Sequence, residues 1–84
     1  MNIYVSNIPF KMMDHELKEL FETQGEVINA RIIKDKLTKR SRGFGFVEMP
    51  DDVATQAIET MNGREVMGLT LRVSEAKSNL NNKE

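Results

Sequence analysis

The sequence predicts an α+β fold in which a four-stranded antiparallel sheet carries two helices on one face. Segments with strand-like alternation and segments with helical spacing follow one another in the order strand, helix, strand, strand, helix, strand. The chain has 84 residues, which is enough for one domain with one core. It has no cysteine, so buried apolar side chains must hold that core together without disulfides.

The first half of the chain supplies a strand, a helix and a second strand. Residues 3–6 are mostly β-branched or aromatic, and the Asn-Ile-Pro sequence after them ends the extended run. Residues 14–23 repeat apolar side chains at helical spacing, and Asp14 is a candidate cap for the first turn. Residues 27–34 alternate again, which predicts the second strand.

The second half supplies the remaining elements in the same way. A polar, basic loop at 35–41 precedes an extended segment at 43–49. A second helix begins at Pro-Asp-Asp and ends at Asn-Gly, within residues 50–63. Residues 69–74 alternate as a fourth strand, and residues 78–84 form a polar tail that we expect to be disordered.

This order of elements is that of a ferredoxin-like βαββαβ sandwich, with both helices on one face of the sheet. We therefore expect one domain over residues 1–77, followed by the tail. The other face of an antiparallel sheet can meet solvent if its side chains are polar or functional.

Aromatic side chains are predicted to gather on that open face. Alternation places Phe44 and Phe46 on one side of the third strand and the small or aliphatic Gly45 and Val47 on the other. The same reasoning places Tyr4 of the first strand beside the two phenyl rings. Three rings on an otherwise polar surface favour a flat partner such as a nucleobase.

Two segments resemble the signatures of the RNA recognition motif family. RGFGFVEM at residues 42–49 matches the longer signature except at its last place, where Met49 replaces an aromatic residue. IYVSNI at residues 3–8 resembles the shorter signature, and the order and separation of the two segments also fit. The resemblance covers roughly residues 2–77. Within the family, the chain is similar to compact single-motif RNA-binding proteins of bacteria.

The resemblance implies that short single-stranded RNA binds on the open face, for post-transcriptional regulation. It makes Tyr4 and Phe46 platforms for stacked bases, and it lets Phe44 pack against sugar or between neighbouring nucleotides. It also implies that Arg42 holds a phosphate. Further candidates for RNA contact come from the second and fourth strands, the basic loop and the segment after the fourth strand. They are Asn29, Arg31, Lys39, Arg40, Arg72, Ser74 and Lys77.

Charge is balanced overall but unevenly distributed. Lysine and arginine total 12 against 13 aspartate and glutamate, for a net charge of -1, which argues against indiscriminate binding of polyanions. Basic residues concentrate around the 35–41 loop, whereas the two helices are acidic. The loop can attract a phosphate backbone, although an ordinary solvated hairpin is the alternative explanation for its single lysines.

Other classes of function fit the same residues less well. An enzyme is disfavoured, because His15 is the only histidine and no polar cluster offers a nucleophile with a base; we expect no catalytic residue, metal site or cofactor. A protein-interaction module using the acidic helices is the stronger rival. Single-stranded DNA is a lesser variant, because stacking does not distinguish the two sugars.

No apolar run approaches the ~20 residues needed to span a bilayer, and no secretory signal is visible at the amino end. We therefore expect a cytoplasmic protein that does not enter membranes. The oligomeric state, the preferred RNA sequence and the regulated transcripts are left open by the sequence.

Overall fold

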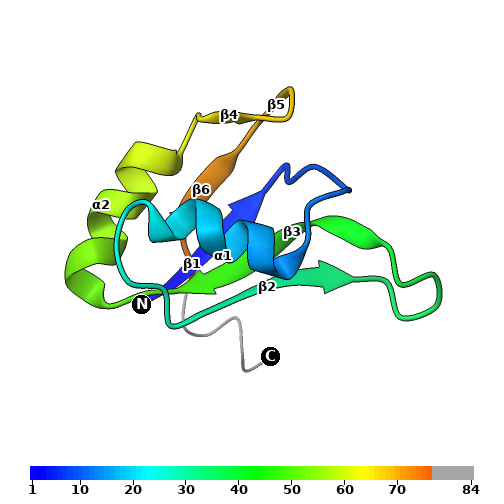
Figure 1. Cartoon of the computed structure of the whole chain (residues 1–84), viewed down its shortest axis with the longest axis horizontal. Helices are drawn as coiled ribbons and strands as arrows, with labels where there is room; N and C mark the ends of the chain where they lie inside the picture. Colours follow the sequence, from blue (N-terminus) through cyan, green and yellow to red (C-terminus); the bar gives the residue numbers. More distant parts are fainter. Residues whose placement is uncertain (77–84) are drawn as a thin grey trace.

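The chain folds into two layers, a sheet and a pair of helices (Figure 1). The computed structural model describes residues 1–76. Lys77 and the expected 78–84 tail therefore lie outside the described residues, as does the boundary between domain and tail. The elements in chain order are β1 (Asn2–Ser6), α1 (Asp14–Glu22), β2 (Asn29–Lys34), β3 (Ser41–Glu48), α2 (Asp51–Met61), β4 (Glu65–Val66), β5 (Leu69–Thr70) and β6 (Arg72–Glu75).

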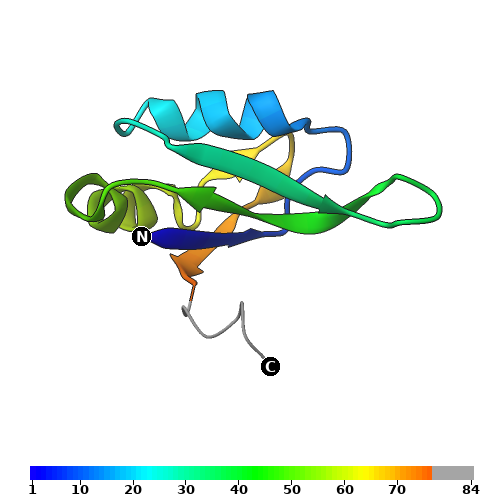
Figure 2. The same ribbon diagram turned by 90° about the horizontal axis from the view of Figure 1, so that it is seen from below.

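Four strands form the main sheet in the order β2-β3-β1-β6, and every neighbouring pair is antiparallel. Figure 2 shows α1 lying along one side of this sheet. The predicted ferredoxin-like α+β sandwich is confirmed, because the two central strands β1 and β3 are separated in sequence by α1 and β2.

The core lies between the sheet and the helices. Ile3 and Val5 of β1 and Val47 of β3 are fully buried, as the alternation of these strands predicts. Phe21 of α1 and Met61 of α2 are also fully buried against them. The opposite face of the sheet therefore carries the other half of each strand's side chains.

The predicted fourth strand at 69–74 is wrong as a single element. Leu69 and Thr70 pair with β4 in a separate two-stranded hairpin, and only Arg72–Glu75 joins the main sheet. Met67 and Gly68 both have positive φ angles, 52° and 85°, and two such residues make the tight turn that suits a two-residue hairpin. Leu71 lies between β5 and β6 in the chain and is fully buried, at the point where the chain passes from the hairpin to the main sheet.

Several element boundaries also differ from the predicted ones, the largest shifts being those of β2 and β3. β2 begins at Asn29 instead of residue 27, and β3 begins at Ser41 and ends at Glu48. Residue 27 is a buried valine that packs in the core before the strand starts. A boundary of this kind depends on where the backbone pairing begins, which alternation alone does not specify.

Asp14 does not cap α1 as expected. Met13 occupies the N-cap position, and its backbone N–H donates to the Glu16 carboxylate over 2.8 Å. The Asp14 carboxylate instead accepts a hydrogen bond from the backbone N–H of Ile32 in β2, at 3.0 Å. Asp14 thus links the start of the first helix to the outer strand of the sheet.

A similar bond occurs at the opposite edge of the sheet. The backbone N–H of Val73 in β6 donates to the side-chain oxygen of Asn62, just after α2, over 2.9 Å. The Leu71 N–H donates to the Arg64 carbonyl, and the Gly63 N–H donates to the Leu71 carbonyl. The turn after α2 therefore covers part of the outer edge of β6.

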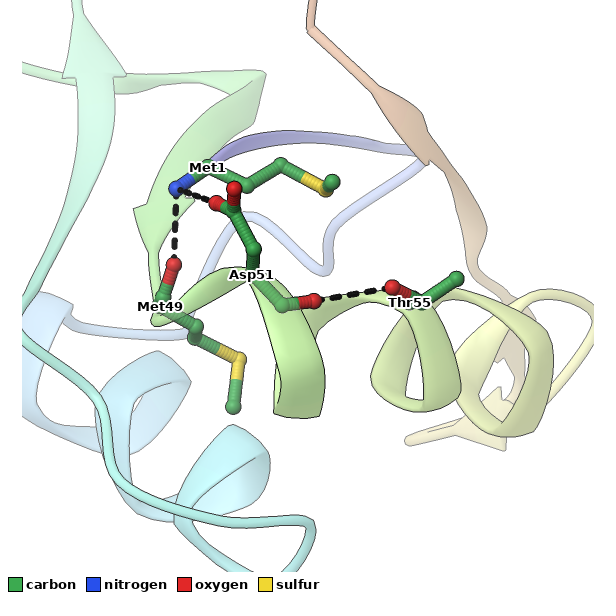
Figure 3. A network of polar contacts seen from close by, with 4 residues as sticks. All are labelled: Met1, Met49, Asp51 and Thr55. Carbon is green, nitrogen blue, oxygen red and sulfur yellow. Dashed lines mark hydrogen bonds and ion pairs between the residues drawn. The ribbon is translucent and has the colours of Figure 1, made fainter.

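The start of β1 is joined to the start of α2 (Figure 3). The α-amino nitrogen of Met1 donates to the Met49 carbonyl over 2.8 Å and lies 3.1 Å from a carboxylate oxygen of Asp51. The Thr55 hydroxyl donates to the Asp51 carbonyl one turn back along the helix.

Neither helix of residues 1–76 is long and apolar enough to cross a membrane.

Candidate nucleic-acid interface

Three aromatic rings meet on the face of the sheet that the helices leave uncovered. The centroid of the Tyr4 ring lies 6.0 Å from that of Phe44 and 5.7 Å from that of Phe46, and the two phenyl centroids are 6.5 Å apart. These separations fall in the range of favourable aromatic pairs. The predicted convergence of the three rings is therefore present in the structure.

The strand register explains why the rings meet. Tyr4 of β1 stands directly opposite Phe46 of β3, and Ser6 stands opposite Phe44. Because side chains on one face of a sheet repeat every two residues, a correct register aligns all three rings. The rings are only partly exposed, since each covers part of the other two.

The rings are not coplanar. The planes of Phe44 and Phe46 meet at 89°, and Tyr4 is tilted by 43° from Phe44 and by 54° from Phe46. A flat ligand can therefore stack on one ring at a time, and a second ligand group must take another orientation. This arrangement suits several separate flat groups better than one extended planar molecule.

Polar residues of the outer strands flank the rings as predicted. Arg31 of β2 stands opposite Phe46, while Asn29, two residues earlier, stands opposite Glu48. On the other side, Ser74 of β6 stands opposite Tyr4. All of these polar flanking side chains are exposed and can offer hydrogen bonds to a ligand that lies on the rings.

A hollow extends the aromatic surface toward the β4–β5 hairpin. It has a volume of about 590 Å³ and is lined by Tyr4, Arg72 and Ser74 together with Thr70 and the Asn62-Gly63 turn. Its size is in the range of small-molecule sites. The predicted residues of β6 thus share one concave surface with the ring of Tyr4.

The basic loop between β2 and β3 is ordered by Asp35. One carboxylate oxygen of Asp35 accepts hydrogen bonds from the backbone N–H groups of Thr38, at 3.0 Å, and Leu37, at 2.8 Å. These two bonds, with a smaller contribution from the charge of Arg42, hold the pKa of Asp35 below its usual value of 3.8. The loop therefore keeps a defined shape at neutral pH.

The cations of this region are exposed. Lys39, Arg40 and Arg42 are all solvent-accessible, and within residues 1–76 no lysine or arginine side chain forms an ion pair with a carboxylate. Their charge is available to an anionic ligand at moderate ionic strength. Lys77, also predicted to contact RNA, lies outside the described residues.

A sequence model of the RNA recognition motif family matches residues 3–72. The chain belongs to the RNA recognition motif family. The predicted family resemblance is thereby confirmed, and the match includes both signature segments and the three rings.

Relatives of known sequence or structure agree with this assignment. The chain is 37% identical to the cleavage stimulation factor subunit 2 tau variant of Homo sapiens, over 84 residues that make up 99% of this chain and 14% of that protein. It thus spans a small part of the length of that relative. It is similar to the crystal structure of the RNA-binding protein PG1, with a TM-score of 0.88, 44% identity and coverage of 100% of this chain and 99% of that one. A solved complex of the Sxl-lethal protein with RNA matches with a TM-score of 0.86 and 35% identity, over 90% of this chain and 46% of that one.

Met49 is the one departure of this RNA recognition motif from the longer signature. Its side chain is fully buried, and it packs in the core between the sheet and the helices. The departure therefore concerns packing of the core. It leaves the rings on the open face unchanged.

Phe10, in the segment between β1 and α1, is 74% exposed and was not among the residues predicted to contact RNA. Loops have no periodicity from which exposure can be inferred. The available signal was the position of Phe10 between Pro9 and Lys11, a large apolar residue in a segment that could not be a strand or a helix. The described residues contain no cluster of His, Cys, Asp or Glu that could hold a metal ion.

Proposed function

We propose that this domain binds short single-stranded RNA on the open face of its sheet, without catalysis. The mutual contact of Tyr4, Phe44 and Phe46 on the uncovered face carries the proposal. Membership of the RNA recognition motif family supports RNA as the ligand, since the family's aromatic residues stack on bases. The domain holds about two or three bases on its rings.

Each group of residues has its own role in this proposal. Tyr4 and Phe46 stack on bases, Phe44 packs against sugar, and Arg42 with its neighbours Lys39 and Arg40 binds phosphates. The polar residues beside the rings supply base preference by hydrogen bonding. Those residues are Asn29, Arg31, Arg72 and Ser74.

The role in the cell depends on whether the domain occupies its site on a transcript. A domain that covers a few nucleotides acts on a transcript by excluding or recruiting other factors, so we propose a post-transcriptional role in the cytoplasm. Cell fractionation followed by crosslinking of RNA to the protein tests this role. Recovery of the cytoplasmic protein without crosslinked RNA would contradict this role.

The Phe46→Ala variant tests the RNA site directly. We expect binding of a short single-stranded RNA pool to weaken by about 1–3 kcal/mol, because one stacking surface is removed. Fluorescence anisotropy measures the affinity, and thermal unfolding checks that the variant is folded. Leu69→Ala in the β4–β5 hairpin is the control, since it removes an exposed apolar side chain, 39% exposed, that belongs to the separate two-stranded sheet and does not line the hollow beside Tyr4.

Unchanged affinity in a folded Phe46→Ala variant would refute the sheet as the RNA site.

A comparison of RNA with DNA of the same sequence tests which sugar the site prefers, because contacts to the 2′-hydroxyl favour RNA and stacking alone does not. A pull-down with and without RNase tests the rival class. Partners that persist after RNase treatment indicate a protein-interaction module.

A further inference from the structure

A basic pocket lies away from the sheet face, between the segment that joins β1 to α1 and the base of the β2–β3 hairpin. Figure 2 shows that segment rising toward α1 beside the hairpin. The pocket has a volume of about 540 Å³, which is large enough for a nucleotide-sized ligand. Its lining residues are Phe10, Lys11, Met12, Met13, Lys34, Lys39, Arg40 and Ser41.

The charge of this lining is of one sign. Four of its residues, Lys11, Lys34, Lys39 and Arg40, are basic, and none is acidic. These four side chains are exposed and come from both sides of the pocket. A concave surface lined by one sign of charge concentrates counter-ions, so its preferred ligand is an anion.

Phe10 adds an apolar surface to the same pocket. Its side chain is 74% exposed, although large apolar residues are usually buried. One edge of the ring lies beside Gly43, because a Cβ atom at that residue would be 3.2 Å from the Cε1 atom of Phe10. The Ile8 N–H donates to the Gly43 carbonyl over 2.9 Å, which ties the segment carrying Phe10 to the start of β3.

The pocket lies beside the start of β3, close in the chain to the aromatic face. Gly43 lies beside Phe10, and the next residue, Phe44, belongs to the three rings. One strand residue spans about 3.3 Å, so a nucleic-acid strand that leaves Phe44 reaches the pocket by turning round the start of β3. The two surfaces can therefore be occupied by one strand.

We propose that this pocket binds a further nucleotide of the same single-stranded RNA, with its base against Phe10 and its phosphate on the surrounding lysines and arginine. The inference rests on the proposed function and adds a subsite beyond the sheet. Base stacking on an aromatic ring tolerates any base. The subsite therefore adds affinity for longer RNA without changing sequence preference.

The length of the RNA separates the two sites. An RNA of about three nucleotides fills the sheet alone, whereas one of about six also reaches the pocket. We expect Phe10→Ala to weaken binding of the longer RNA by about tenfold, the effect of removing one stacked base, and to leave binding of the shorter RNA unchanged. Leu37→Ala is the matched control, because Leu37 is an apolar residue of the adjacent loop, 91% exposed, that does not line the pocket.

The binding of phosphate is tested by two charge-matched double variants. K11Q/K34Q removes two cations that line the pocket, and K18Q/R64Q removes two exposed cations that line neither the pocket nor the hollow beside Tyr4. We expect only the first to reduce the salt dependence of binding of the longer RNA, by a log-log slope of about 0.7 for each phosphate group that the variant no longer binds. An NMR spectrum of each variant checks that the fold is retained.

The outcomes distinguish this inference from the proposed function. If Phe46→Ala weakens binding of both RNAs and Phe10→Ala weakens neither, RNA binds the sheet and the subsite is refuted. If Phe10→Ala weakens both RNAs equally, Phe10 acts on the sheet site and the subsite is also refuted. If neither variant has an effect, the proposed function itself fails. Selective weakening of the longer RNA by Phe10→Ala supports the subsite.

Discussion

At Gly45 the backbone of β2 occupies the space that a side chain would need. A Cβ atom there would overlap the Arg31 carbonyl oxygen and lie 2.9 Å from the Cα atom of Ile32. The register of β2 shifts between Ile32 and Lys34, which marks a bulge beside this contact. Gly45 is not among the residues with positive φ. Space, and not backbone conformation, therefore requires glycine at this position.

The Gly45→Ala variant should lower the free energy of unfolding by about 1–3 kcal/mol, because β2 must move to admit the methyl group. Urea denaturation measures the change. NMR shifts at the amides of Arg31 and Ile32 would show that β2 has moved. A variant as stable as the wild type, with unchanged shifts in β2, would contradict the steric explanation.

Gly68→Ala is the matched control for that experiment. Gly68 has a φ of 85° and nothing within 4 Å of its missing Cβ, so its substitution has a conformational cost of about 1–2 kcal/mol and no clash. Its NMR shifts should remain within the β4–β5 hairpin. The location of the shifts then separates clash from backbone strain.

Alternation along β1 and β3 was sufficient to predict which aromatic residues share the open face. It could not predict that the rings touch and so bury part of one another, since this depends on the register between strands. It also could not find Phe10, whose exposure depends on a loop conformation fixed by the bond from Ile8 to Gly43.

At the scale of elements, both helices and the strands of the main sheet were predictable from spacing. The hairpin of β4 and β5 was not, because Leu69, Leu71 and Val73 continue one alternating pattern through two different strands. The turn at Met67-Gly68 was the missed signal. A glycine after a residue able to adopt positive φ is typical of a two-residue hairpin, yet methionine is an unusual partner in that turn.

Side-chain caps on the outer strands tie the elements together. We expect Asn62→Ala to lower the free energy of unfolding by about 1–3 kcal/mol, because the partly buried N–H of Val73 loses its acceptor. Chemical denaturation measures this change, and hydrogen exchange should accelerate at the Val73 amide. Gln56→Ala removes an exposed amide of α2 and should change stability by less than about 0.5 kcal/mol. Equal effects of the two substitutions would contradict a role for the cap.

At the scale of the whole molecule, the nearly neutral net charge conceals a separation of charges. The basic loop and pocket lie at one end of the sheet, whereas each helix carries two acidic residues in its first turn and no basic residue in its last turn. Counting charges in the sequence gives -1. The sequence alone predicted the basic loop and the acidic helices, and the placement of the elements adds Lys11, from the segment before α1, to the cations at this end.

Binding should accordingly weaken as salt is raised. We expect the log-log slope of affinity against salt concentration to be about 0.7 for each phosphate contact on single-stranded RNA. Arg42→Gln should reduce the slope by about that amount, because one cation beside β3 is removed. Anisotropy titrations at several salt concentrations measure both slopes. A wild-type affinity independent of salt would exclude a phosphate-binding role for the loop.

The two caps have a consequence for the association of one copy of the domain with another. An outer strand with unpaired N–H and C=O groups is a template for pairing with a second chain. Here Asp14 accepts the Ile32 N–H on one flank, and Asn62 accepts the Val73 N–H on the other. A strand from another chain therefore cannot accept hydrogen bonds from these two N–H groups. Each cap thus removes one of the donors by which a strand of another copy could extend the sheet.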